Sequence, residues 1–152
     1  MNTFQVASDI IVNAPAQQVY DILADYDVGH RAILPEKYFK EMTVLEGGKG
    51  AGTKIRVEME VMGNQSTFNL VVTEPEPGRI LEESDAEAGI STVFTIEPRN
   101  EGAQSWVEIR STNRGKPGLM GKLEQWVVTA VTKRIYREEL ANLNEYAQRV
   151  TA

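Results

Sequence analysis

The side chains that could move a proton at neutral pH are few in this chain. Its 152 residues include no cysteine and one histidine, His30. Imidazole is the side chain whose unperturbed pKa lies near neutrality, so it is the natural acid or base, with Tyr26 and Tyr38 as neighbouring phenols. We favour an exposed loop position for His30 and keep a catalytic position as the alternative. No nearby serine has a nucleophile-elbow context, so a Ser-His-Asp hydrolase has little support.

The same inventory argues against metals and cofactors. Without cysteine there is no zinc-cysteine or iron-sulfur site, and one histidine cannot build a multi-histidine site. Two carboxylate pairs, Glu58 with Glu60 and Asp21 with Asp25, have spacings that share one face of a strand or a helix and could hold a hard cation. The alternating charges around Glu58 mark a solvated face, however. We therefore predict no metal and no cofactor.

The glycine-rich stretch 47–54 resembles a phosphate-binding loop only superficially. Gly52-Thr53-Lys54 departs from the G-x-x-x-x-G-K-[ST] order, and the stretch joins two expected strands instead of opening a helix. The glycines more plausibly supply positive φ angles in a hairpin.

The charge distribution argues against a nucleic-acid partner. The chain carries 16 basic and 22 acidic side chains, a formal net charge of −6, and should be repelled by polyanions. Residues 74–101 are the most acidic, whereas 102–152 are net basic. Lys133, Arg134 and Arg137 mark the surface that a protein partner would use. No aliphatic stretch reaches the roughly 20 residues of a membrane helix, so we predict no stable membrane insertion and a cytoplasmic location.

The elements follow from hydrophobic period and turn residues. An opening strand is expected over 4–12, a short helix after Asn13-Ala14-Pro15 to about Asp25, and a further turn or two over 31–37. Six segments from Phe39 onward, separated by turn residues, predict an antiparallel meander. One long helix is expected over 119–149, about 45 Å long and crossing the whole sheet.

Alternation within the strands assigns their faces. Residues 54–61 place an aliphatic side chain at every odd position and a charge at every even one, so one sheet face is buried and the other wet. By the same reasoning Trp106, Glu108 and Arg110 should point outward, as should Asn69. A slip of one residue would instead carry the trio inward.

Several motifs in order resemble a known superfamily. They are Asn13-Ala14-Pro15 with the helix to Asp25, Leu34-Pro35, Val44 to Gly48, Gly50 to Thr53, Glu74 to Arg79, and Thr95 to Pro98. The whole chain, 1–152, resembles a single SRPBCC domain of the START and birch-pollen-allergen type, in its polyketide cyclase/dehydrase-like branch. The resemblance implies an α+β helix-grip fold: a curved antiparallel sheet of about seven strands around a long C-terminal helix.

The resemblance also implies a hydrophobic cavity between sheet and helix, and a single apolar sheet face covered by one long helix fits that geometry. Each expected wall residue could equally be ordinary core. The expected lining is Ile55, Val57, Met59, Phe68, Leu70, Phe94, Ile96, Val107, Ile109, Leu123, Trp126, Val127 and Ala130.

Three functions remain open at this point. The leading hypothesis is binding or carriage of a small hydrophobic ligand, polyketide-like, isoprenoid or lipid. The first alternative is a cyclase or dehydratase in which His30, Tyr26 or Tyr38 moves a proton. The second is a protein-interaction module.

Overall fold

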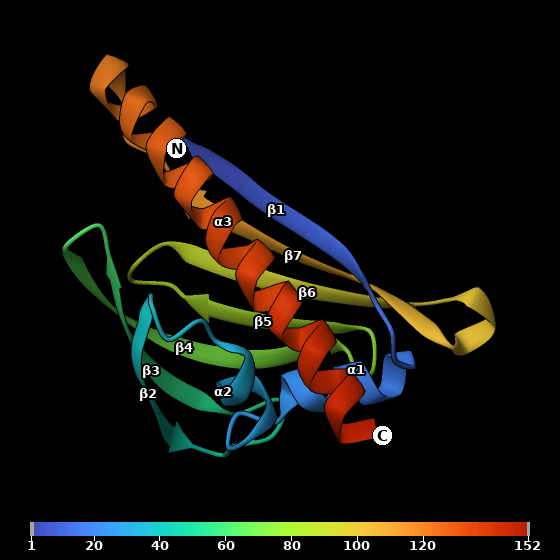
Figure 1. The fold of residues 1–152 in the computed structure, drawn as a ribbon. Coiled ribbons are helices and arrows are strands. Elements are labelled where there is room, and N and C mark those ends of the chain that lie inside the picture. The colour runs from blue at the N-terminus through green and yellow to red at the C-terminus, as the bar shows by residue number, and fades with distance from the viewer. Residues whose placement is uncertain (1, 152) are drawn as a thin grey trace.

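In the computed structural model, which describes residues 2–151, a seven-stranded antiparallel sheet curves around one long helix (Figure 1). This confirms the expected α+β helix-grip architecture. The elements are β1 (Thr3–Val12), α1 (Ala16–Ala24), α2 (Gly29–Ile33), β2 (Phe39–Glu46), β3 (Lys54–Val61), β4 (Asn64–Glu76), β5 (Ile80–Asp85), β6 (Ile90–Arg99), a 3-10 turn (Asn100–Gly102), β7 (Gln104–Arg114) and α3 (Gly118–Thr151).

The sheet has the order β1-β7-β6-β5-β4-β3-β2, every pair antiparallel. Strands β2 to β7 are joined by hairpin-length turns. The first strand of the chain, β1, pairs with the last strand, β7, so that β1 and β2 form the two edges of the sheet. The predicted alternation is confirmed on β3, where Ile55 and Val57 are buried and Arg56 and Glu58 are exposed. The buried face is concave and turned toward α3.

The outward trio of β7 is also confirmed. Residues 105, 107, 109 and 111 are buried, so the residues between them face the other side of the sheet. The Arg110 guanidinium donates two hydrogen bonds to Glu108, and the Trp106 indole donates to Asp9 at 2.8 Å. Asn69 is exposed, as expected.

The second helix begins and ends earlier than the predicted 31–37. It spans Gly29–Ile33. Leu34 is extended, with φ −69° and ψ 128°, because a residue before proline is pushed out of the helical region. Pro35 therefore ends the helix instead of interrupting it.

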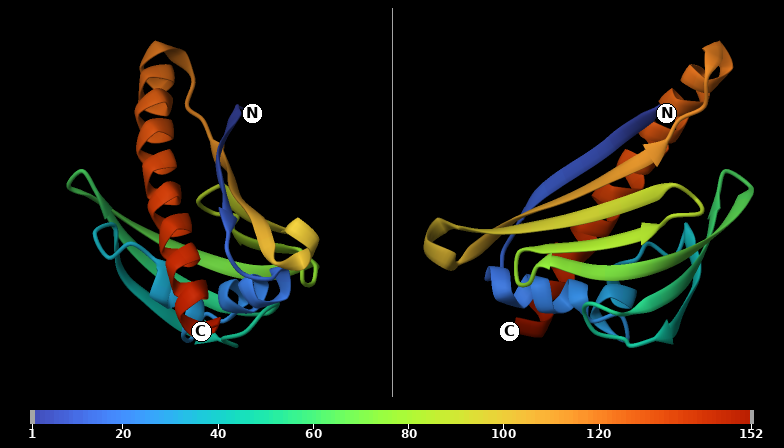
Figure 2. Two further views of the ribbon diagram at one scale, coloured as in Figure 1. Left: turned by 45° about the vertical axis from the view of Figure 1, so that its right-hand side comes forward. Right: turned by 180° about the vertical axis from the view of Figure 1, so that it is seen from behind.

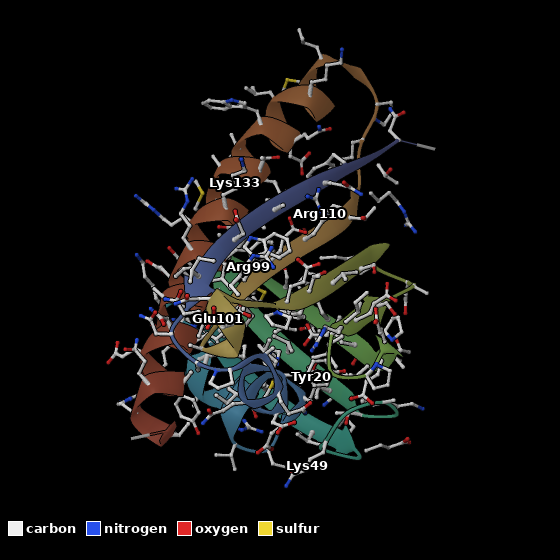
Figure 3. The ribbon with its side chains drawn as sticks, turned by 90° about the vertical axis from the view of Figure 1, so that its right-hand side faces the viewer. Tyr20, Lys49, Arg99, Glu101, Arg110 and Lys133 are labelled. Carbon is white, nitrogen blue, oxygen red and sulfur yellow. The ribbon has the colours of Figure 1, made fainter. Side chains whose placement is uncertain are left out.

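The glycine-rich loop holds the connection between α1 and α2. The Tyr26 N–H donates to the Gly48 carbonyl at 2.8 Å, and the Gly50 N–H donates to the last turn of α1. Gly48 has a φ of +144°, and a Cβ there would lie 2.5 Å from an Asp27 oxygen. The predicted structural role of the glycines is confirmed. Lys49, in the same loop, lies at the end of the molecule opposite the first turn of α3 (Figure 3).

Helix α3 is most fully covered by the rest of the molecule along its second half. Ile135, Leu140, Leu143 and Ala147 are buried, whereas the first turns extend past the edge of the sheet (Figure 2). The Asn142 side chain donates to the Ile33 carbonyl at 3.0 Å and ties α2 to this second half. None of the helices in the described part of the chain has the length and apolar character needed to cross a bilayer.

Candidate ligand-binding cavity

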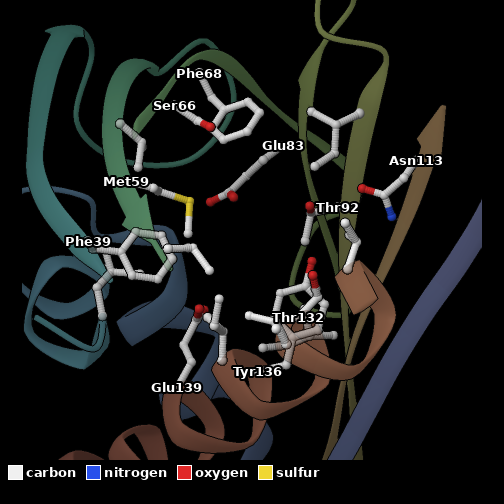
Figure 4. Close-up of a pocket in the computed structure, with 18 of the residues that line it drawn as sticks. Phe39, Met59, Ser66, Phe68, Glu83, Thr92, Asn113, Thr132, Tyr136 and Glu139 are labelled. Atoms are coloured by element: carbon white, nitrogen blue, oxygen red, sulfur yellow. The ribbon is translucent and has the colours of Figure 1, made fainter. Parts of the chain in front are cut away.

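A cavity of about 880 Å³ lies between the concave sheet face and α3 (Figure 4). Its size falls within the range of roughly 300–1,000 Å³ that is usual for small-molecule sites. Met62, in the β3–β4 turn, and Met120 and Leu123, in the first turns of α3, line the cavity and are exposed. The cavity therefore opens between this turn and the overhanging start of α3.

Nine of the thirteen residues expected on the wall line the cavity. They are Ile55, Val57, Met59, Phe68, Leu70, Phe94, Ile109, Leu123 and Val127. Most come from alternate positions of the strands, which is why the period-2 pattern located them. Whether they contact a ligand stays a prediction.

The other four lie elsewhere, so their placement on the wall is corrected. Ile96 and Val107 are cross-strand partners and fully buried, at the part of the sheet against which α1 packs. Trp126 is 71% exposed, and Ala130 is exposed as well. The stripe of α3 that lines the cavity runs through Leu123, Val127 and Val131. Trp126 and Ala130 each precede a member of this stripe by one residue, so they lie on a different side of the helix, facing away from the cavity.

His30 lies at the inner end of the cavity, and its expected exposure is wrong: it is 2% exposed and lines the wall. Its ring stacks on Tyr26 with 4.5 Å between centroids and meets the Phe94 ring edge-on. Nδ1 lies 2.7 Å from the Leu23 carbonyl oxygen. A carbonyl only accepts, so Nδ1 carries a proton and Nε2 is directed at the Glu83 carboxyl, 3.4 Å away.

The two candidate tyrosines do not reach the cavity. Tyr26 is fully buried, and its hydroxyl donates to Glu83 Oε2 at 2.6 Å. Burial, then the Glu83 charge, raises the pKa of Tyr26 well above its usual range. Tyr38 is buried beside α2, and Lys37 lies over its ring. Of the three residues proposed to move a proton, the structure brings only His30 to the cavity wall.

Two carboxyl groups that sequence reasoning missed also face this inner end. Glu83 on β5 and Glu139 on α3 reach into the cavity from opposite walls (Figure 4). Glu139 is 4% exposed, and burial, followed by the Glu83 charge, raises the pKa of Glu139 to about 8. At pH 7 this carboxyl is therefore largely protonated.

Tyr136 and Thr92 complete the polar end of the cavity. Burial raises the pKa of Tyr136 to about 12, although hydrogen bonds with Ser111 and Thr92 act in the opposite direction. The remaining wall is mainly aliphatic, aromatic and methionine side chains. Chemically, the cavity offers a broad apolar surface and one cluster of proton-carrying groups.

Both missed glutamates left a signal in the sequence. Glu83 is in phase with the apolar Leu81 on β5, and both are buried. Glu139 follows Ile135 by four residues and precedes Leu143 by four, so it lies within the apolar stripe of α3. A charged residue in phase with buried neighbours marks an interior polar site.

The carboxylates of the two predicted pairs either make local hydrogen bonds or face solvent. The Asp25 side chain accepts from the backbone N–H groups of Asp27 and Val28, and Asp21 accepts from Gln17. Glu58 is exposed on β3. Within residues 2–151, no group of three or more His, Asp or Glu side chains is arranged to hold a metal ion.

The comparisons with known proteins agree with this fold. The family model described as "Polyketide cyclase / dehydrase and lipid transport" matches residues 3–148. Among solved structures, the KanY protein is 26% identical over 97% of this chain and 99% of its own, with a TM-score of 0.84. A comparison with curated proteins gives no match.

Two further solved structures share the fold at lower identity. TTHA0849 from Thermus thermophilus is 18% identical over 98% of this chain and 100% of its own, with a TM-score of 0.78. The Zhui aromatase/cyclase from Streptomyces sp. R1128 is 17% identical over 99% of this chain and 97% of its own, with a TM-score of 0.77.

Proposed function

Because this chain belongs to the polyketide cyclase/dehydrase and lipid-transport family, we propose that it binds a small hydrophobic molecule in the cavity between the sheet and α3. The observation that supports this most is the cavity itself, about 880 Å³ with a mainly apolar wall. Burial of apolar ligand surface there would stabilise the complex by about 25 cal/mol per Å² before the costs of association. Polyketide-like, isoprenoid and lipid molecules all fit this description.

The open side supports entry of a ligand without unfolding. Met62, Met120 and Leu123 surround it with flexible or exposed apolar side chains. Methionine adapts to differently shaped partners because it is unbranched and polarisable. A carrier or binding protein with this rim would accept a range of apolar ligands.

A pair of tryptophan variants on β6 tests the binding function. Thr92 lines the cavity, whereas Thr95 lies on the opposite face of the same strand. Thr92→Trp fills the cavity and should weaken binding of the neutral dye N-phenyl-1-naphthylamine, followed by its fluorescence, by about tenfold or more. Thr95→Trp should bind the dye as the parent does. Equal binding by both variants, or no dye binding by the parent, would contradict a binding cavity.

A second candidate function, proton transfer on a bound carbonyl compound, is favoured by the position of His30. His30 Nε2 and Glu83 Oε2 lie 3.4 Å apart. This places an imidazole and a carboxyl group side by side at the closed end of an apolar cavity. A cyclase or dehydratase needs such a pair to remove a proton beside a carbonyl and return one.

Hydrogen–deuterium exchange at the methyl group of 2-acetonaphthone tests this candidate. In the reaction the base removes a methyl proton, the carbonyl carries the charge as an enolate, and a deuteron from solvent replaces the proton. Proton NMR in D2O should show faster exchange with the parent, at the level of roughly 100-fold, and loss of that acceleration in His30→Gln. If His30→Gln still binds the dye and still accelerates exchange, His30 is not the base.

A role as a protein-interaction module stays a prediction. Lys133, Arg134 and Arg137 are exposed on α3, as an interaction surface requires. A cytoplasmic location likewise stays a prediction.

A further inference from the structure

The ionisable groups of the cavity wall include no lysine or arginine. Among the described lining residues they are Glu83, Glu124 and Glu139, with His30 and Tyr136. A ligand with a carboxylate or phosphate would lose its hydration in this cavity without gaining a lysine or arginine partner. The composition of the wall therefore disfavours an anionic ligand.

Glu139 differs from every other buried carboxyl in what surrounds it. Asp85 accepts hydrogen bonds from the backbone N–H groups of Asn69 and Ala88, which hold its pKa below the usual range. Glu83 accepts from Tyr26 and faces His30. Within the described residues, no hydrogen bond or ion pair reaches the Glu139 carboxyl.

The Glu139 oxygens border the cavity. In the described part of the chain, no side-chain polar atom sealed from solvent lacks a hydrogen-bond partner. The unpartnered oxygens of Glu139, whose side chain is 4% exposed, must therefore border the cavity. These oxygens can therefore accept hydrogen bonds from a ligand group that enters the cavity.

We propose that the ligand carries a protonated nitrogen on an apolar body, and that Glu139, with Glu83 opposite, binds this nitrogen at the closed end of the cavity. This inference rests on the proposed binding function. The apolar body would lie against the aliphatic strands, and the ammonium group would complete the hydrogen bonding of Glu139. The chemical class is an apolar amine, as opposed to a fatty acid or an acidic polyketide.

The titratable groups around Glu139 predict a proton released on binding. Glu83 faces it from β5, His30 from α2 and Tyr136 from α3 itself, with Tyr26 behind Glu83. Burial, then the Glu83 charge, raises the pKa of Glu139 to about 8, so that without an ammonium partner the carboxyl is largely protonated at pH 7. An ammonium group in contact favours the carboxylate, so Glu139 loses its proton to the buffer while the ligand keeps its own.

Three probes that share a naphthalene body separate charge from apolar burial. They are 2-(1-naphthyl)ethylamine, 2-(1-naphthyl)ethanol and 1-naphthaleneacetic acid, each titrated by calorimetry at pH 7 in two buffers of different ionisation enthalpy. The amine should bind about tenfold or more tightly than the alcohol, and the acid more weakly than either. The enthalpy of amine binding should depend on the buffer in the sense of proton release, and that of the alcohol should not.

Two glutamine variants assign the effect to a residue. Glu139→Gln should bring the amine to the affinity of the alcohol and abolish proton release, with the alcohol unchanged. Glu145→Gln is the matched control: this glutamate is exposed on the same helix and lies off the cavity wall, so the amine should keep its advantage.

The outcomes separate the inference from the function on which it rests. Equal binding of amine and alcohol, or an amine preference that survives in Glu139→Gln, overturns the inference and leaves hydrophobic binding intact. The same holds if the amine fails to bind while N-phenyl-1-naphthylamine binds. If neither the naphthyl probes nor the dye bind, the binding function falls as well.

Discussion

The two halves of α3 share an apolar stripe but lie in different surroundings. Both contain apolar side chains at helical spacing, yet Leu140 in the second half is 1% exposed and Leu123 in the first half is 56% exposed. In the second half, Asn142 donates to α2 and Asn144 accepts from the backbone just after β1, whereas residues of the first half line the open side of the cavity. An apolar stripe thus indicates that one face of a helix is shielded from water, and the fold determines whether protein or ligand contacts that face.

The largest expected effect is on stability and contrasts Leu140 with Leu123. Leu140→Ala should lower the free energy of unfolding by about 2–5 kcal/mol, since it leaves a cavity in a packed core. Leu123→Ala should cost less than about 1 kcal/mol because its side chain is already half exposed. Urea denaturation measures both. Similar costs for the two variants would mean that both halves are packed alike.

The second prediction concerns the ionisation of Glu139, the carboxyl group buried in the second half of α3. Glu139 has a pKa of about 8 in the folded protein against an ordinary value of 4.5. As pH rises between these values, the unfolded chain releases this proton before the folded one does. The free energy of unfolding should therefore fall relative to Glu139→Gln, by about 1.4 kcal/mol per pH unit at most.

Denaturation of both proteins at pH 5 and pH 8 measures that difference. Glu145→Gln, an exposed carboxyl on the same helix, controls for the removal of a charge. A stability difference between Glu139→Gln and the parent that is the same at both pH values would show that Glu139 ionises normally.

The smallest expected effect separates two sides of the first half. Trp126→Ala should change the free energy of unfolding by less than about 0.5 kcal/mol and leave dye binding unchanged, because Trp126 is exposed and off the cavity wall. Val127→Asp places a charge on the wall and should weaken dye binding. If Trp126→Ala weakened binding instead, the ligand would lie on the outer side of the helix.

Most of the fold could be predicted from local patterns. Alternation on β3 and the turn residues after Phe39 located the strands because one sheet face is buried and hairpins need particular turn residues. Helix α3 was predicted almost to its ends, since Pro117 directly precedes it and no proline follows.

The site was less predictable because it depends on which elements meet. Nothing local to His30 says that β5 brings Glu83 to its Nε2, or that stacking on Tyr26 buries the ring. Trp126 and Ala130 were misplaced because a wide apolar stripe does not fix which of its edges faces the sheet. Glu83 and Glu139 were accessible to sequence reasoning only as charges in phase with buried neighbours.

Methyl NMR of the protein titrated with N-phenyl-1-naphthylamine is the most direct test that apolar ligands enter the cavity. Intermolecular contacts should appear from the dye to the methyl groups of Ile55, Val57, Leu70 and Ile109, which line the cavity. The exposed Leu45 and Val71, which lie outside the wall, should show none. Contacts confined to these two exposed side chains, with the four interior residues unaffected, would contradict ligand binding in the cavity.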